Sequence, residues 1–465
     1  MGQNIISQKE KQKQFILSGN LWKVMVQLSW PAVIAMVLYG FNSVLDAIFV
    51  GHYIGETALA GVSVAYPLSQ ISVAFGSLIG VGAGSVLSIS LGNQDKKTQE
   101  RLLGNVNWLS LVTTIVYMVL GLIFSTQLMQ VMGGKGEALV LGDTYFRITI
   151  LGSFFWIYGL AGNMIIRSEG KMKSAAIMMG IGLLVNGIAN YILIAVLDLG
   201  VEGAAWGTNI GMFVYTFLAW IYFGEGFASF KTKIFVLHRD KDIIKSILGL
   251  GMSSLIMSIM NLVQAVVVFN ALSKYGTMAD LAFYGAVYRV FTFLLTPIFG
   301  LMRALQPVAG INYGAKQYER AINSYKIFTL ASMVLTLPFW IISMISPESI
   351  LGLMLTEQVF SGMQIIYFRI YMAALPLLSM IFTAMTFFPS VDKGKPAAIL
   401  GIIRQLVFFI PVMLILPKRI GVSGVYYGTF GIDIIIVLLT IIMVKKEFVF
   451  LRKKISNPLN NNKAS

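Results

Sequence analysis

Apolar residues in this chain come in long continuous runs, separated by short polar segments that contain Gly, Pro, Lys and Arg. Many of these runs exceed about 18 residues, the length that an α-helix needs to cross the hydrocarbon core of a bilayer. The pattern predicts an all-α integral membrane protein with twelve spanning helices. They are expected at residues 24–50, 59–90, 104–132, 142–165, 174–196, 203–223, 243–272, 280–310, 321–345, 364–386, 396–416 and 423–444.

Composition agrees with a polytopic membrane protein. Hydrophobic residues make up 57% of the chain and charged residues 12%, against about 25% charged residues in soluble domains. Residues 1–20 are polar and Lys-rich and have no small-residue cleavage site, so we expect no cleaved signal peptide. The chain has no Cys, which excludes disulfides and thiolate metal sites.

The positive charge is distributed unevenly between the two sides of the predicted membrane. Most of the 35 Lys and Arg lie in segments on the side of the N-terminus, and the loops on the other side hold only Lys135, Lys274, Lys418 and Arg419. The positive-inside rule therefore predicts that both termini are cytoplasmic. Because the net charge of +15 is confined largely to short loops, it indicates membrane topology and no nucleic-acid partner.

Short sequence matches recur at an offset of 222 positions, as from 145 to 367. They include YFRI at 145–148 and 367–370, AAI at 175–177 and 397–399, and the pairs Tyr66 with Tyr288 and Gly92 with Gly314. The repeat predicts two homologous six-helix bundles in the same orientation, a plan that many transporters share. The expected divisions are an N-terminal arm (1–23), a first bundle (24–223), a linker (224–242), a second bundle (243–444) and a basic tail (445–465).

One carboxylate, Asp46, lies inside the first predicted span, where a charged side chain is costly and usually faces a cavity or a partner. Because Asp46 is near the outer end of that span, a solvated helix end is the alternative. Asn42 lies four residues earlier on the same helix face. Asn186 and Asn190 form a second such pair in the fifth span, and Thr208 follows in the sixth. Such a group of oxygen atoms suits a proton or a hard cation.

Other polar and aromatic residues have less definite predictions. Asp433, well inside the twelfth span, either lines a cavity that attracts cationic compounds or pairs with a nearby Arg. Tyr39 and Tyr66 belong to a Met- and aromatic-rich set that suits a pocket able to repack around different compounds, although such residues also serve as ordinary core. With no Cys, no intramembrane His and no paired acids, we expect neither an enzyme nor a bound cofactor.

Four stretches together resemble the multidrug and toxic compound extrusion (MATE) transporters. They are SWPAVIAMVLYGFNSVLDAIFVGHYIG at 29–55, GVGAGSVLSISLGNQDKKTQERLLG at 80–104, VNGIANYILIAVLDLGVEGAAWGT at 185–208 and LQPVAGINYGAKQYERA at 305–321. The resemblance covers nearly the whole chain and is nearest to the prokaryotic branch with its cation site in the N-terminal half. It implies a V-shaped pair of bundles that exports amphipathic, often cationic, compounds in exchange for H⁺ or Na⁺.

The resemblance also implies roles for individual residues. Asp46 matches the first-helix carboxylate that the branch uses as its protonation or cation site, and Asn186 and Thr208 match its oxygen ligands. Asn190 stands where relatives often carry a second Asp, so the site is less negative, which favours H⁺ over Na⁺ as the coupling ion. Family members are thought to bend the first helix on protonation, and Pro31 removes a backbone hydrogen bond there.

The expected partners are thus small amphipathic or cationic compounds, H⁺ or Na⁺, and the lipid of a bacterial plasma membrane, with the protein as a monomer. A lipid-linked saccharide flippase of the same superfamily is the alternative function. A flippase would hold a diphosphate with cationic side chains in its cavity, and Arg289, Arg303 and Arg404 keep this alternative open.

Overall fold

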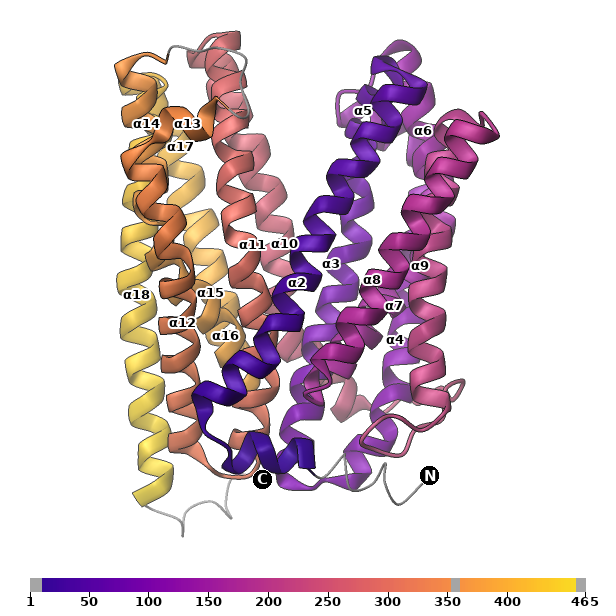
Figure 1. Cartoon of the computed structure of the whole chain (residues 1–465), viewed down its shortest axis with the longest axis vertical. Coiled ribbons are helices and arrows are strands. Elements are labelled where there is room, and N and C mark those ends of the chain that lie inside the picture. The colour runs from indigo at the N-terminus through magenta and orange to yellow at the C-terminus, as the bar shows by residue number, and fades with distance from the viewer. Residues whose placement is uncertain (1–10, 353–359, 457–465) are drawn as a thin grey trace.

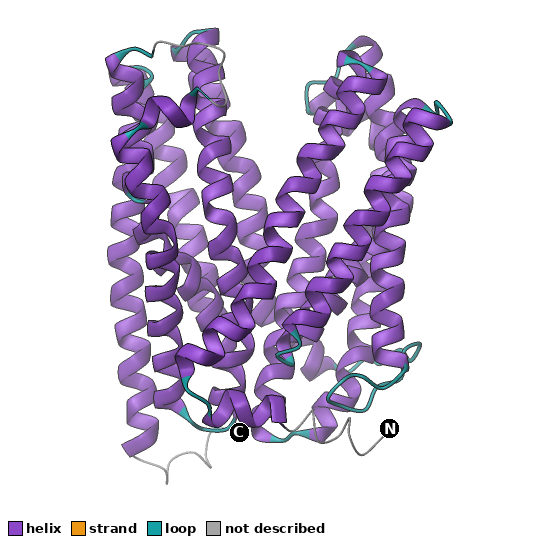
Figure 2. Ribbon diagram, in the orientation of Figure 1, coloured by secondary structure: helices purple, strands orange, loops and turns teal. Residues whose placement is uncertain are grey.

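The structure, a computed structural model, describes residues 11–352 and 360–456 of the 465-residue chain. The beginning of the predicted N-terminal arm and the end of the predicted basic tail lie outside these residues. Helices account for nearly all of the described chain, and loops are short apart from the segment between the two halves (Figure 2).

The helices follow the two halves of the sequence repeat. The first half contains α2 (Leu21–Phe49), η1 (Val50–Ile54), α3 (Glu56–Asn93), α4 (Lys96–Ile123), α5 (Ser125–Val131), α6 (Gly136–Leu151), α7 (Ser153–Ser168), α8 (Met172–Asn190), η2 (Tyr191–Val196) and α9 (Gly200–Gly224). The second half contains α10 (Lys241–Tyr275), α11 (Met278–Gly314), α12 (Tyr318–Ile345), α13 (Pro347–Leu351), α14 (Gly362–Ala373), α15 (Leu375–Ser390), α16 (Gly394–Ile402), η3 (Ile403–Phe409), α17 (Ile410–Ile420) and α18 (Ser423–Ser456).

These helices make up the twelve predicted spans. Within the described ranges, nine helices are long and apolar enough to cross a membrane, and α6 with α7 forms a tenth span bent by 53°. The remaining two, α9 and α18, run alongside the others in their bundles (Figure 1). The prediction of a twelve-helix membrane protein is confirmed.

Element boundaries repeat with the spacing of the sequence repeat. The starts of α3 and α11, of α4 and α12, and of α8 and α16 are each 222 positions apart, and so are the breaks in the fourth and tenth spans, at Gly152 and Ala374. The sequence analysis did not predict these two breaks. At the first of them, the side-chain amide of Asn209 donates to the carbonyl of Ile148 at 2.7 Å. Asn209 thereby satisfies a backbone acceptor where the helix is interrupted.

Capping side chains fix where several spans begin. Asn20 accepts from the backbone N–H groups of Trp22 and Lys23 at the start of α2. Asp95 accepts from the N–H and hydroxyl of Thr98 at the start of α4, and the hydrogen bonds of Thr98 hold the pKa of this loop carboxyl below its ordinary value. These caps satisfy backbone donors that have no partner within the helix. They therefore define where the polar turns give way to apolar helix.

The two bundles lie together at the end that carries both chain termini and diverge toward the opposite end, so the molecule is V-shaped (Figure 1). At the joined end α3 crosses α11 through glycines. A Cβ on Gly92 would lie 2.3 Å from the Ile311 carbonyl oxygen, and one on Gly314 would lie 2.1 Å from that of Ile89. The contact is symmetric, because each residue in it is the repeat counterpart of another. Small residues let the two backbones approach this closely.

A side chain at this crossing should destabilise the protein. We expect Gly314→Ala to lower the free energy of unfolding by about 1–3 kcal/mol, since its Cβ would overlap backbone atoms that cannot move independently. Gly285→Ala is the matched control on the same helix, because nothing lies within 4 Å of its Cβ. Thermal unfolding of the purified proteins in detergent measures both. Equal melting temperatures for the two variants would contradict the crossing.

Candidate functional site

The carboxylate of Asp46 is held by side-chain amides from α2 and α8. Asn42 donates to one carboxylate oxygen at 3.2 Å, and Asn190 donates to the other at 2.7 Å. The same amide nitrogen of Asn42 also donates to the side-chain oxygen of Asn186, at 2.9 Å. The structure therefore joins the two i, i+4 pairs of the sequence into one network, and both Asp46 oxygens accept hydrogen bonds.

The network is largely shielded from solvent and contains no cation. Asn186 and Asn190 are 5% and 2% exposed, and Asp46 is half-buried. Among the described residues Asp46 forms no ion pair, so neutral amides alone stabilise its charge. The Nδ2 atom of Asn186 and the Oδ1 atom of Asn190 are buried and have no hydrogen-bond partner.

Both helices of the network widen into π-helix beside it. The segment η1 begins at Val50, whose N–H donates to the carbonyls of Asp46 and Ala47, and η2 begins at Tyr191, directly after Asn190. π-Helical turns are rare and concentrate at functional sites. These π-helical turns could not be predicted from the sequence, because residues such as YILIAV at 191–196 suit an ordinary apolar helix equally well.

Close packing of α9 holds the Asn190 side chain in place. A Cβ on Gly207 would lie 2.1 Å from Oδ1 of Asn190, so only glycine fits there. The next residue, Thr208, donates its hydroxyl to the Ala204 carbonyl at 3.0 Å and lies beside the Tyr145 hydroxyl. Thr208 thus reaches the neighbourhood of Asp46 through Tyr145 instead of bonding to the carboxylate itself.

Four tyrosines surround the open side of the network. Tyr39, Tyr66 and Tyr145 each lie near enough to Asp46 for electrostatic interaction, and Tyr66 interacts in the same way with Tyr288 of the second half. Tyr66 is 51% exposed. Tyr288 is its repeat counterpart, so equivalent positions of the two halves lie near enough to interact electrostatically. Sequence reasoning missed Tyr145 and Tyr288 as site residues, although the repeat already paired Tyr66 with Tyr288.

A second polar cluster lies in the other half. Asp433, 2% exposed, accepts from the Arg404 guanidinium at 2.9 Å. The side-chain oxygen of Gln264 lies 3.5 Å from another guanidinium nitrogen of Arg404. The sequence left two alternatives open for Asp433, and the structure shows the one in which it pairs with an Arg. Gln264 is 222 positions after Asn42, so the first helix of each half contributes an amide to its polar cluster.

Comparison with known proteins identifies the family that has this architecture. The MatE family model matches residues 31–192 and 250–415, which together are more than half of the chain. The chain belongs to the MatE family.

Named relatives and solved structures of this family match nearly the whole MatE chain. It is 26% identical over 422 residues to the multidrug export protein MepA of Staphylococcus aureus, covering 90% of this chain and 92% of the relative. MepA of Staphylococcus saprophyticus is 24% identical over 438 residues, with 94% and 96% covered.

The structural likeness is closer than the sequence likeness. An outward-facing multidrug resistance MATE transporter of the MOP superfamily superposes with a TM-score of 0.88 at 25% identity, covering 95% of this chain and 98% of that one. A MATE protein crystallised in a bent conformation superposes with a TM-score of 0.89 at 24% identity, with 96% and 99% covered.

The predicted bending residue of this MatE protein lies apart from the network. Pro31 is buried in α2, which continues through it as a helix, and is fifteen residues before Asp46 along the chain. Its neighbourhood is the joined end of the two bundles, where Val33 lies against Gly300 of α11. The structure therefore places Pro31 two residues before a contact between the halves, which Val33 makes.

Displacing the Asn190 amide tests whether the network matters for activity. We expect Gly207→Ala to lower the transport rate roughly tenfold or more, because its methyl group pushes away a side chain that donates to a charged carboxylate. Gly187→Ala, between Asn186 and Asn190 on α8, has open space around its Cβ and should transport normally. Dye efflux from proteoliposomes compares the two variants. Normal efflux by Gly207→Ala would contradict a functional role for the Asn190 contact.

The Arg404–Asp433 pair should behave as a buried ion pair. Arg404→Gln should cost about 3–5 kcal/mol of unfolding free energy, because the Asp433 charge stays buried without a partner. Asp433→Asn should cost less, because the Arg404 side chain is 19% exposed. The double variant should lose less than either single variant. Unfolding of all three proteins in detergent forms a double-mutant cycle. Strictly additive losses would show that the two groups do not interact.

Proposed function

We propose that this MatE protein is a multidrug efflux antiporter that exports amphipathic, often cationic, compounds in exchange for H⁺. The observation that carries the proposal is the half-buried Asp46 carboxylate, which neutral amides stabilise and which forms no ion pair within the described residues. Such a group changes the charge of its surroundings by a full unit when it binds a proton. The multidrug export relatives support the substrate class.

The arrangement of the amides favours a proton over Na⁺. A hard cation needs several oxygen ligands, whereas the atoms that touch the Asp46 oxygens are amide nitrogens of Asn42 and Asn190. Protonation requires less rearrangement. The carboxyl then becomes a donor, and the buried, unpartnered Oδ1 of Asn190 supplies an acceptor once that side chain turns.

Proton binding can be linked to the arrangement of the bundles through α2. This helix carries Asp46 and Asn42, packs against α8 within its own half, and also packs against α11 of the other half. A proton on one Asp46 oxygen replaces an acceptor of Asn42 or Asn190 with a donor, and so changes how α2 sits on α8. Proton and exported compound then need only favour opposite conformations, and they need not share a binding site.

With both termini cytoplasmic, as the charge distribution predicts, the divergent end of the V faces outward. In this state Asp46 takes up a proton from the outside and the cationic compound leaves. In the inward state the proton is released and a new compound binds. The exposed face of Tyr66 and its counterpart Tyr288 offer flat aromatic surfaces to a cation between the bundles.

The flippase alternative draws less support from the arginines. Arg404, which is half-buried, is already paired with the buried carboxylate of Asp433, so its charge is not free for a diphosphate. Arg303 lies at the joined end beside Tyr39 and Tyr215. The antiporter therefore remains the proposal that the site geometry favours.

Asp46→Asn tests the proposal directly. In proteoliposomes loaded with ethidium, we expect a pH gradient alone to drive efflux by the wild type, and a Na⁺ gradient alone to have no effect. The variant should lose the pH-driven component by about 5- to 150-fold, the usual range of coupling between two sites. Asp198→Asn is the control, since Asp198 is an exposed loop residue at positive φ, a conformation that Asn also tolerates.

Three outcomes decide the matter. Full pH-driven efflux by Asp46→Asn overturns the role of Asp46. Efflux driven by Na⁺ in the wild type overturns the choice of ion. Failure of the wild type to move any cationic dye, with folded protein present, shifts the weight to the flippase.

A further inference from the structure

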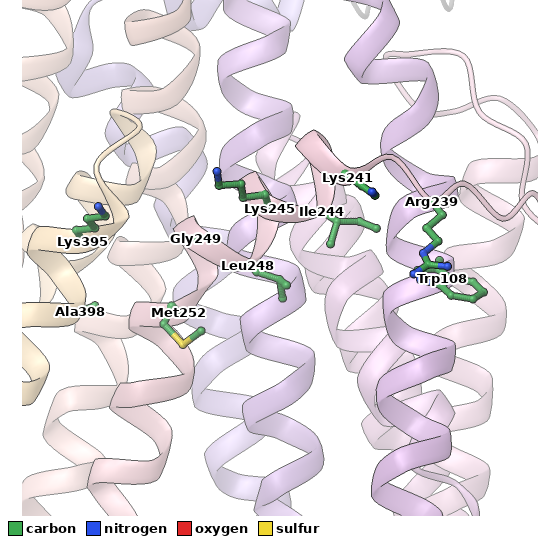
Figure 3. A pocket seen from close by; sticks show the side chains of 10 residues that line it. All are labelled: Trp108, Arg239, Lys241, Ile244, Lys245, Leu248, Gly249, Met252, Lys395 and Ala398. Atoms are coloured by element: carbon green, nitrogen blue, oxygen red, sulfur yellow. The ribbon is translucent and has the colours of Figure 1, made fainter.

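A basic cavity of about 680 Å³ lies on the seam between the two halves, at the end that carries the termini. Trp108 of α4 and Arg239 of the linker form its wall in the first half. Lys245 of α10 and Lys395 of α16 line the opposite wall (Figure 3). The cavity belongs to neither the Asp46 network nor the Arg404 pair, and the transport cycle proposed above makes no use of it.

The linker is fixed where it borders this cavity. Asn107 of α4 donates to two linker carbonyls, at 2.6 and 2.9 Å, and Asn105 accepts from the backbone N–H of Asp240 at 2.7 Å. Between these anchors the Arg239 guanidinium lies 5.6 Å from the centre of the Trp108 ring, a cation–π distance. Arg239 is therefore held at the cavity wall instead of extending freely into solvent.

The charges around the cavity are not balanced by ion pairs. Four cations line it, Arg239, Lys241, Lys245 and Lys395, and none of them forms an ion pair within the described part of the chain. The neighbouring carboxylate of Asp240 is bound instead to Arg101, at 2.9 Å. The cavity therefore presents an excess of positive charge to whatever enters it.

The inner part of the cavity is apolar, in contrast to its cationic rim. Along one face of α10, Lys241 and Lys245 are followed by Leu248 and Met252, one and two turns further into the bundle. Ala398 of α16 adds to this apolar floor. A cavity with a cationic rim and an apolar floor matches a ligand that carries an anionic head on a hydrocarbon chain.

We propose that this cavity binds an anionic phospholipid, with its phosphate at the end lined by Lys245 and Lys395 and an acyl chain along Leu248 and Met252. Basic pockets between membrane helices on the cytoplasmic side are suited to such headgroups. With the termini cytoplasmic, as proposed above, the ligand comes from the inner leaflet. Since the walls belong to different halves, a lipid that fills the cavity contacts both of them and stabilises the arrangement in which these ends are joined.

Native mass spectrometry of the full chain tests the binding. Protein is transferred from nanodiscs that contain equal amounts of phosphatidylglycerol and phosphatidylcholine. We expect the wild type to retain phosphatidylglycerol preferentially and Lys245→Gln/Lys395→Gln to lose that preference. Lys445→Gln/Lys446→Gln removes the same charge from exposed positions on α18, outside the cavity, and should retain it. This readout does not involve transport, so its failure leaves the antiporter proposal untouched.

A second variant and a competitor distinguish the sources of the phosphate. Ala398→Trp fills the apolar floor and keeps every charge, so it should reduce lipid retention as well. Inorganic phosphate at millimolar concentration should displace little lipid. Equal retention of the two lipids by the wild type overturns the proposal, as does an equal loss in the α18 control. Displacement by phosphate together with normal retention by Ala398→Trp assigns the cavity to a free phosphate and overturns the lipid.

Discussion

The architecture depends on one contact, the crossing of α3 and α11 where Gly92 and Gly314 bring two backbones together. Each of these glycines lies against the carbonyl of the other helix, so nothing larger fits at the centre of the repeat. Because the bundles are pinned at this end, they can diverge only at the other end, which gives the V shape (Figure 1). A transporter that alternates its access needs such a fixed point, around which two rigid halves can move.

Equivalent positions in the two halves carry polar clusters with different charges. Each has a polar cluster that draws on its first, fifth and sixth helices, and Asn42 and Gln264 occupy equivalent positions in the first of them. In the second half an arginine neutralises the carboxylate, which is itself buried. In the first half the side chains that donate to Asp46, within the described ranges, are the amides of Asn42 and Asn190. The two halves thus share a fold but differ in charge. Of the two carboxylates, Asp46 is the one without a cationic partner among the described residues.

Much of this could be predicted from the sequence, for identifiable reasons. Apolar run length predicted the twelve spans because a bilayer dictates helix length, and the i, i+4 spacing of Asn42 with Asp46 predicted their contact because helix geometry is local. The breaks at Gly152 and Ala374 and the π-helical turns could not be predicted. They depend on partners far along the chain, such as Asn209 for the first break. The same reason explains why Tyr145, brought near Asp46 by packing between helices, was missed.

Asp46 lies far from the place where the two halves are joined, and α2 connects the two regions. From Asp46 to Val33 the helix spans thirteen residues, about 20 Å at 1.5 Å per residue. At Val33 it touches Gly300 of α11, so one continuous helix joins the proton-binding end to a contact between the halves. Pro31 lies two residues from that contact and removes one backbone hydrogen bond there. In the antiport cycle proposed above, a change in how α2 sits on α8 near Asp46 is therefore carried along this helix to its contact with the other half.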